Sequence, residues 1–201
     1  MKKVSFFLLG AAFLASSLAF VAPKNPKAPI TLAVQSDKSR VDFIGSKAGD
    51  FHTGTFAVKG GSVQVEGGKL VGGSFEIDMK SIVCDDIKDA EYNGKLVGHL
   101  KSDDFFSVDK NPVSKFVITK ATVKAGNKYT ITGNLTIKGK TKAITFPAYV
   151  NVVDGKVAAQ ATFNVDRSDF DVKFGSASFF DGLGDKVIYD DFNVSLNLVT
   201  K

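Results

Sequence analysis

Hydrophobic and polar residues alternate with a period of two along most of the chain after Thr31. In the stretch 129–137, apolar residues or glycine occupy the odd-numbered positions, and threonine or asparagine occupies the even-numbered positions. Runs of the same kind cover residues 71–80, 144–152 and 192–198. Successive side chains of a β-strand point to opposite faces of its sheet, so this pattern predicts half-buried strands.

The length of these runs and the turns between them indicate how the strands are connected. Several runs reach about ten residues, longer than the usual strand of about five or six. Gly67-Gly68, Gly126-Asn127 and Asp154-Gly155 lie between runs and favour tight hairpin turns. We therefore predict an all-β protein, an antiparallel closed β-barrel of about eight strands, whose interior is filled by side chains or holds one small ligand.

The segment from Cys84 to Phe106 breaks the alternation. Leu96, Val97 and Leu100 recur in it at helical spacing. Ser102 is a candidate cap for a short turn that ends at Phe106. We expect a partly helical crossover between hairpins that covers one end of the barrel.

The N-terminal residues have the pattern of a secretory signal peptide. Lys2 and Lys3 precede an almost wholly apolar stretch, and Ser17-Leu18-Ala19 supplies a small-x-small cleavage pattern. The alternative is a membrane anchor, because the uncharged run Val4–Ala22 is just long enough to span a bilayer. We favour the signal peptide, which predicts an exported protein, either periplasmic or secreted.

These signals divide the chain into three parts. Residues 1–19 are the predicted signal peptide. Residues 20–36, which contain three of the five prolines, are interpreted as a leader remnant and a proline-rich linker. Residues 37–201 form the predicted barrel domain.

Composition excludes some functions. The net charge of +5 is small and its basic residues are dispersed, so we expect no nucleic-acid partner. Cys84 is the single cysteine and cannot form a disulfide within the chain, so the fold depends on its core. Because Cys84 precedes Asp85 and Asp86, we expect its pKa to be raised, which disfavours a nucleophilic role.

The sequence contains no recognisable enzyme or metal motif. The two histidines, His52 and His99, are far apart in the chain and lack further ligands at a recognisable spacing. An enzyme that uses His99 with Asp104 is the less favoured alternative. We therefore predict no catalytic residues, no metal and no cofactor.

Apolar residues on the strand faces are the candidate ligand-binding residues. The chain has 18 phenylalanines, and several of them occupy apolar strand faces. The period-two alternation is the same for a packed core and for an apolar ligand cavity. The candidates for the apolar interior are Phe75, Ile131, Leu135, Phe146, Phe163 and Phe192.

Several segments together resemble the YceI-like family of lipocalin-like β-barrels, which is associated with polyisoprenoid binding. The resemblance extends from about Asp37 to Val199. The segments that carry it are His52–Thr55, Leu70–Ile82, Gly98–Phe106, Asn111-Pro112, Gly133–Gly139 and Phe163–Arg167.

The resemblance implies an exported carrier that holds a long polyisoprenoid or isoprenoid-quinone lipid in the barrel and that contacts a membrane surface transiently. One alternative is a packed interaction or stress module of the cell envelope with no ligand. Another is a transmembrane barrel, whose alternation would be inverted. The chain shows no evident aromatic girdles at the strand ends and terminates in Val199-Thr200-Lys201, which disfavours the transmembrane barrel.

A phosphate or quinone headgroup would need a cation or hydrogen-bond donor at the barrel mouth. The candidates are His52, His99, Lys101 and Arg167. Arginine offers a planar fork suited to phosphate, whereas lysine acts as a compact charge. The alternative for Arg167 is an ion pair with Asp103 or Asp104 that holds the crossover in place.

Overall fold

The computed structural model describes residues 28–201, so the predicted signal peptide and residues 20–27 of the predicted linker lie outside the described residues. It contains nine strands, one α-helix and three short 3-10 helices. In chain order these are β1 (Ile30–Ala33), η1 (Ser36–Lys38), β2 (Arg40–Lys47), β3 (Asp50–Glu66), β4 (Lys69–Cys84), α1 (Ala90–Lys101), β5 (Val113–Ala125), β6 (Lys128–Ile137), β7 (Lys140–Val153), β8 (Lys156–Asp166), η2 (Arg167–Phe170), η3 (Gly184–Lys186) and β9 (Asp191–Val199).

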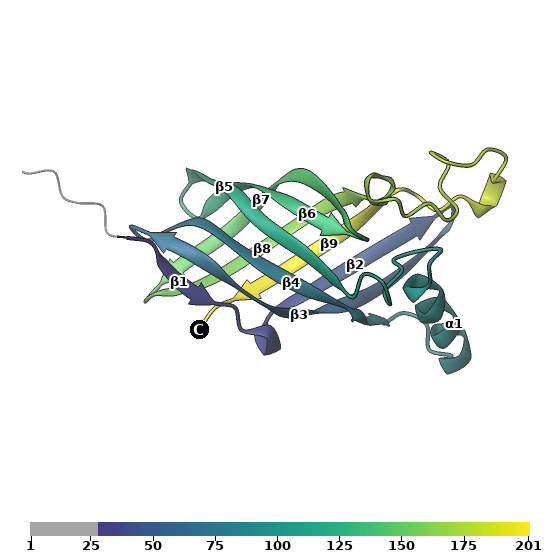
Figure 1. Cartoon of the computed structure of the whole chain (residues 1–201), viewed down its shortest axis with the longest axis horizontal. Helices are drawn as coiled ribbons and strands as arrows, with labels where there is room; N and C mark the ends of the chain where they lie inside the picture. Colours follow the sequence, from purple (N-terminus) through teal and green to yellow (C-terminus); the bar gives the residue numbers. More distant parts are fainter. Residues whose placement is uncertain (1–27) are drawn as a thin grey trace, which may run out of the picture.

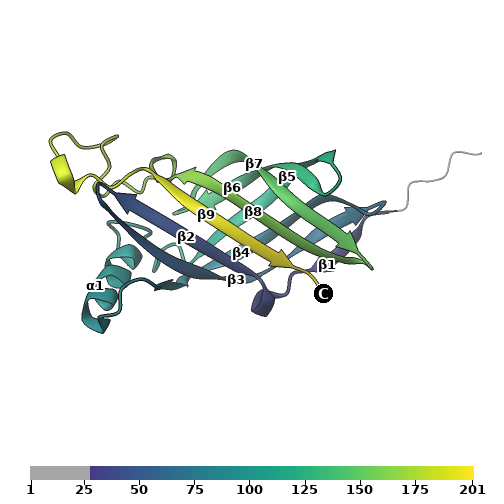
Figure 2. The same ribbon diagram turned by 180° about the vertical axis from the view of Figure 1, so that it is seen from behind.

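Eight of the strands, β2 to β9, close into an antiparallel barrel. The strand order is β3-β2-β9-β8-β7-β6-β5-β4, and pairing of β3 with β4 completes the ring. Figure 1 shows an elongated barrel with α1 and the long loop after β8 at one end, and Figure 2 shows β9 beside β2 from behind. The predicted fold class is confirmed. We refer to the end that carries α1 as the mouth.

The sheet begins earlier than we expected. Strand β1 pairs with the C-terminal half of β3, with Ile30 opposite Val65 and Ala33 opposite Ser62. These residues fall inside the range 20–36 that the sequence assigned to a linker. The reason is the length of β3: its N-terminal half pairs with β2, and its C-terminal half extends past β2 and leaves an edge that β1 pairs with.

The apolar faces of the strands point into the barrel. On β6, Tyr129, Ile131 and Leu135 are buried, whereas Asn134 is exposed. On the outer face, the Thr132 and Thr145 hydroxyls of paired strands are 2.9 Å apart. This is the predicted alternation, in the orientation opposite to that of a transmembrane barrel.

Three of the hairpins have turns with left-handed backbone conformations at both central residues, and one of these turns is the glycine pair Gly67-Gly68, with φ values of 56° and 76°. Lys138 and Gly139 have φ values of 49° and 72°, and Asp154 and Gly155 have φ values of 50° and 72°. Positive φ at both central residues identifies type I′ turns, whose twist matches that of the strands they join.

The crossover contains the predicted helix. Helix α1 begins after Asp89, whose carboxylate accepts hydrogen bonds from the backbone N–H groups of Glu91 and Tyr92. The Asn93 side chain donates to the carbonyl oxygens of Cys84 and Ile87, which ties α1 to the end of β4. Ser102 differs from our expectation: it ends α1, donating its backbone N–H to Gly98 and His99. Among the helices of residues 28–201, none is long and apolar enough to cross a membrane.

Candidate functional site: an apolar cavity inside the barrel

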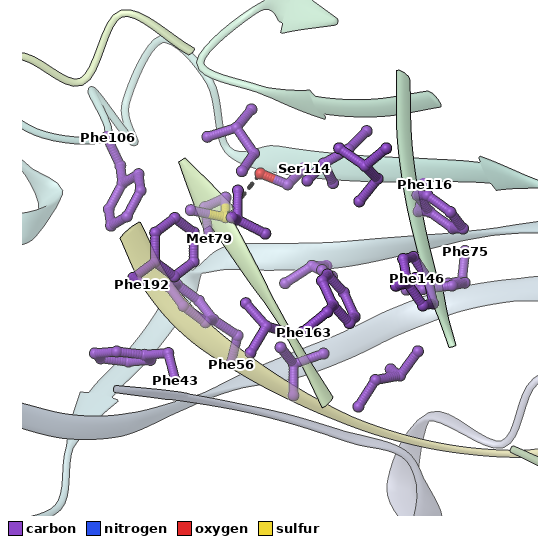
Figure 3. A pocket seen from close by; sticks show the side chains of 18 residues that line it. Phe43, Phe56, Phe75, Met79, Phe106, Ser114, Phe116, Phe146, Phe163 and Phe192 are labelled. Atoms are coloured by element: carbon purple, nitrogen blue, oxygen red, sulfur yellow. Dashed lines mark hydrogen bonds between the residues drawn. The ribbon is translucent and has the colours of Figure 1, made fainter. Parts of the chain in front are cut away.

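The barrel interior contains a narrow apolar cavity that opens toward the mouth. Its 18 lining residues come from all eight barrel strands and from Phe106 of the crossover (Figure 3). Ser114 is the one polar residue of this lining, and its hydroxyl donates to the sulfur of Met79 at 3.0 Å. About 70 Å³ is open to a water-sized sphere, and the empty space between the side chains, including the opening, amounts to about 660 Å³.

A second, smaller cavity of about 40 Å³ lies deeper, toward the end of the barrel that carries β1. Four residues line both cavities and therefore lie between them: Phe75, Phe116, Phe146 and Leu196. We call the three phenylalanines the aromatic partition. Their ring centroids are 5.7 Å apart for Phe75 and Phe116 and 5.5 Å apart for Phe116 and Phe146.

The rings of the aromatic partition are held in place by their neighbours. Phe146 stacks on Phe163 with centroids 4.0 Å apart and ring planes 8° from parallel. A Cβ atom at Gly133 would lie only 2.4 Å from the Phe116 ring, so the absence of a side chain there makes room for that ring. Figure 3 shows the partition grouped at the end of the cavity that is remote from Phe106.

All six residues that the sequence proposed for the interior line one of the two cavities. Phe75, Leu135, Phe146, Phe163 and Phe192 line the larger cavity, and Ile131 lines the smaller one.

Other lining residues were not identified from the sequence. Phe43 and Phe116 each have a polar residue before them and an apolar residue after them, so no clean alternation marks their inward direction. Phe106 lies in the crossover, where no periodicity indicates that its ring reaches the cavity. Only the path of the crossover over the mouth places it there.

A row of aromatic contacts leads from the cavity to the surface at the mouth. Phe106 lies between Phe56 and Phe105, with ring centroids 6.2 Å and 6.0 Å away, respectively. Phe105 contacts Phe174 at 5.8 Å, and the Phe174 side chain is 43% exposed. His99 packs edge-on against Phe174 at 4.4 Å. Aromatic rings therefore extend from the cavity lining at Phe106 to the exposed ring of Phe174.

Arg167 has a structural role that the sequence did not reveal. It is 4% exposed, and its guanidinium donates to the carbonyl oxygens of Tyr189, Val172, Phe174 and Ile188. The guanidinium also forms an ion pair with Asp190, whose Oδ1 lies 3.2 Å from Arg167 Nη2 but accepts no hydrogen bond.

This environment corrects both expectations for Arg167. Burial lowers its pKa, and the nearby carboxylates of Asp190 and Asp166 partly offset that effect. Its ion-pair partner is Asp190 rather than Asp103 or Asp104. Its hydrogen bonds hold the loop after β8, and its contact with the crossover is the packing of the guanidinium over the Phe105 ring. Because Arg167 is 4% exposed and four of its N–H groups donate to backbone carbonyls, it is poorly placed to bind a headgroup.

The other headgroup candidates do not converge on one point. His99 Nε2 lies 3.8 Å from Asp104 Oδ2, and Lys101 is half-buried in the last turn of α1. His52 instead pairs with Asp86 at the ends of β3 and β4, with His52 Nδ1 2.8 Å from Asp86 Oδ2. His99 and Arg167 are brought together, because both contact the ring of Phe105.

The barrel with this interior matches one protein family. Residues 32–200 match the model of the YceI-like domain, which confirms the resemblance found in the sequence. Among curated relatives, a UPF0312 protein of Pseudomonas aeruginosa is 41% identical over 85 residues, covering 38% of this chain and 43% of the relative. A UPF0312 protein of Shewanella denitrificans is 30% identical over 99 residues, covering 49% of each chain. The match thus spans less than half the length of these relatives.

Solved structures share the fold over most of the chain. Burkholderia cenocepacia BcnA is 25% identical, with a TM-score of 0.65, and the match covers 84% of this chain and 99% of BcnA. A polyisoprenoid binding domain from Saccharophagus degradans, implicated in plant cell wall breakdown, has a TM-score of 0.63 at 15% identity. That match covers 84% of this chain and 97% of the domain, and at this identity it shows a common fold.

Proposed function

The chain belongs to the YceI-like domain family, and from that premise we propose that it is an exported carrier of one long polyisoprenoid-type lipid. The observation that carries this proposal is the apolar cavity, whose lining has a single hydroxyl among its 18 residues. Burial of one methylene group contributes about 0.8 kcal/mol, so an apolar chain binds such a cavity with few polar contacts.

The size of the cavity bears on how a lipid chain enters. The cavity volume of about 70 Å³ is well below the usual range for ligand pockets, about 300–1,000 Å³. Side chains that line the cavity must therefore change rotamer to admit a prenyl chain. We expect the phenylalanine rings near the mouth to move most.

The mouth favours a neutral headgroup. Phe106 lines the cavity, and Phe105 and Phe174 continue the row of aromatic rings from it toward the surface. Arg167 is buried, and its hydrogen bonds go to carbonyl oxygens of the loop after β8. His99 and Lys101 remain as candidate donors to a headgroup. These surroundings fit an isoprenoid quinone or a prenol better than a prenyl phosphate.

Transient membrane contact is part of the proposal. The loop after β8 carries Phe179 and Phe180, which are 42% and 49% exposed, and it lies at the mouth (Figure 1). Aromatic side chains exposed together beside a lipid cavity suit insertion at a membrane surface. We infer that a lipid enters the barrel from a membrane through this end.

Mass spectrometry of organic extracts tests the proposal directly. Protein purified from its native envelope should yield about one prenyl lipid per chain. Repeated recovery of lipid-free protein, together with failure of added prenols to raise the melting temperature, would overturn it. That result would favour the packed interaction module.

A further inference from the structure

Three side chains with metal-binding atoms meet at the ends of β3 and β4, outside the lipid cavity. The ligand atoms of His52, Cys84 and Asp86 all lie within 4.8 Å of one another. None of the three lines the cavity. We propose that these residues form a binding site for a single transition-metal ion, with Zn²⁺ the best-suited ion.

The backbone places the three residues together before any ion binds. Strand pairing puts Gly54 of β3 opposite Cys84 of β4. His52 is two residues before Gly54 and therefore lies at the same end of the barrel as Cys84. The Thr53 N–H donates to Asp86 Oδ1 at 2.7 Å, and the Asp85 N–H donates to the Thr53 carbonyl at 2.9 Å. The carbonyl of Cys84 is in turn held by Asn93 of α1. A preformed site of this kind needs little rearrangement on binding.

The three ligand atoms lie within 4.8 Å of one another, and His52 and Cys84 contact different oxygens of the Asp86 carboxylate. His52 Nδ1 is 2.8 Å from Asp86 Oδ2, and Cys84 Sγ is 3.2 Å from Asp86 Oδ1. Bonds of about 2.0–2.3 Å from Zn²⁺ to nitrogen, oxygen and sulfur require ligand atoms roughly 3.3–3.8 Å apart. A shift of about half an ångström in each side chain would admit the ion.

The chemistry of the three ligands selects the class of metal. Imidazole and thiolate prefer Zn²⁺ and neighbouring transition metals over Ca²⁺ or Mg²⁺. Three protein ligands leave a fourth position for water. His52 and Asp86 are partly exposed, so an ion can approach from solvent, whereas Cys84 is buried.

Binding requires one proton to leave. Burial raises the pKa of the Cys84 thiol, and its hydrogen bond to Asp86 raises it further. Asp86 is already ionised near neutral pH: burial alone would raise its pKa, but hydrogen bonds from His52, Thr53 and Cys84 lower it. The metal therefore displaces the thiol proton to solvent. The imidazole, whose Nδ1–H faces Asp86 without the metal, binds through Nδ1 after that proton is exchanged through solvent to Nε2. No electron transfer is involved.

Titration of the tag-free, reduced full chain with Co²⁺ tests the site. Coordination by Cys84 should produce a thiolate-to-Co²⁺ charge-transfer band that saturates at one ion per chain and disappears when Zn²⁺ is added. The band should weaken as the pH falls, because protons compete for the thiolate. Zn²⁺ should also raise the melting temperature of the wild-type protein.

Variants separate coordination from hydrogen bonding. Cys84→Ser should abolish the band, and His52→Gln and Asp86→Asn should each weaken Co²⁺ binding at least tenfold. His99→Gln, at the other histidine, is the matched control and should leave binding unchanged. Absence of the band in the wild-type protein, or unchanged Co²⁺ affinity in both His52→Gln and Asp86→Asn, would show that the cluster is only a hydrogen-bonded tie. Either outcome leaves the lipid proposal untouched, because the two sites share no residue.

Discussion

Ile131 and Asn134 lie on the same strand, β6, and have opposite surroundings. Ile131 is 3% exposed and faces the barrel interior, where it lines the smaller cavity. Asn134 is exposed on the outer face. At the scale of single residues, the face on which a side chain lies decides which substitution the barrel tolerates.

Ile131→Asp should lower the free energy of unfolding by about 3–5 kcal/mol or prevent folding, because it buries a carboxylate with no partner. Asn134→Asp adds the same charge on the outer face and should change the free energy of unfolding by under about 0.5 kcal/mol. Urea denaturation followed by circular dichroism measures both. Equal losses in the two variants would contradict the assigned register.

The loop after β8 illustrates the scale of a structural element. The conformation of this loop depends on Arg167, whose buried guanidinium donates hydrogen bonds to the loop carbonyl oxygens. It also depends on Asp190, whose carboxylate balances the charge of Arg167. Ser178 donates to Asp190 Oδ2 at 2.6 Å. Burial alone would raise the pKa of Asp190, but hydrogen bonds from Ser176 and Ser178 and the charge of Arg167 outweigh it, so the pKa lies below 3.8.

The lowered pKa of Asp190 predicts a pH-dependent contribution to stability. A depressed folded-state pKa stabilises the fold above the unfolded value, and this stabilisation is lost as the pH falls toward the folded-state pKa. Asp190→Asn should therefore lower the free energy of unfolding by about 2 kcal/mol at neutral pH. Its difference from wild type should shrink between about pH 5 and pH 2.

Urea denaturation at several pH values measures this difference. The lowered pKa values of other carboxylates, such as Asp86, contribute in both proteins and cancel. A difference that stays constant with pH would contradict the charge pairing of Asp190 with Arg167.

The same loop should supply the side chains through which the protein binds to a membrane surface. Replacing Phe179 and Phe180 together by serine removes two exposed rings at the mouth and should weaken binding to vesicles of phosphatidylethanolamine and phosphatidylglycerol at least tenfold. Val153→Ser is the matched control, because Val153 is exposed at the opposite end of the barrel. Co-sedimentation with vesicles measures the effect. If Val153→Ser weakened vesicle binding as much as the double variant, the proposed orientation would be wrong.

At the scale of the whole molecule, the closed barrel confines any ligand to a channel divided by the aromatic partition. The three rings come from three different strands, β4, β5 and β7. A chain that enters at the mouth meets these rings before it can reach the smaller cavity. The partition should therefore limit the length of lipid chain that the barrel holds.

Phe146→Leu should join the two cavities and admit a longer chain. In the wild-type protein, we expect affinity for prenols of increasing length to stop rising once the chain reaches the partition. In the variant, it should continue to rise by about tenfold or more for each further isoprene unit. The variant should remain folded, with a loss of about 1–2 kcal/mol in the free energy of unfolding.

Competition binding with a series of prenols measures this length dependence. Phe56→Leu is the control, because Phe56 lines only the larger cavity. It should change overall affinity without extending the preferred length. Identical length profiles for wild type and Phe146→Leu would show that the partition does not limit the chain.

The strands, the direction of their side chains and the closed barrel could all be predicted from the amino-acid sequence. These features follow from interactions over short distances in the chain: the period of two sets each face, and residues such as Asp154 and Gly155 set the turns. The apolar candidates, among them Phe75 and Phe146, lie in the interior for the same reason. Strand β1 was missed because its pairing depends on the free edge of the distant strand β3.

The interaction partners of the polar residues became known from the tertiary structure and could not be predicted from the sequence. Arg167 has carboxylates close by in the sequence, yet its carboxylate partner is Asp190, and its other donors bind loop carbonyls that no local pattern indicates. His52 and Asp86 are 34 positions apart and meet only because β3 pairs with β4. A polar side chain forms hydrogen bonds only with groups that the fold places within about 3 Å of it. The burial of a strand face produces a repeating pattern in the sequence, so it can be predicted. A hydrogen bond or ion pair between residues far apart in the chain produces no such pattern.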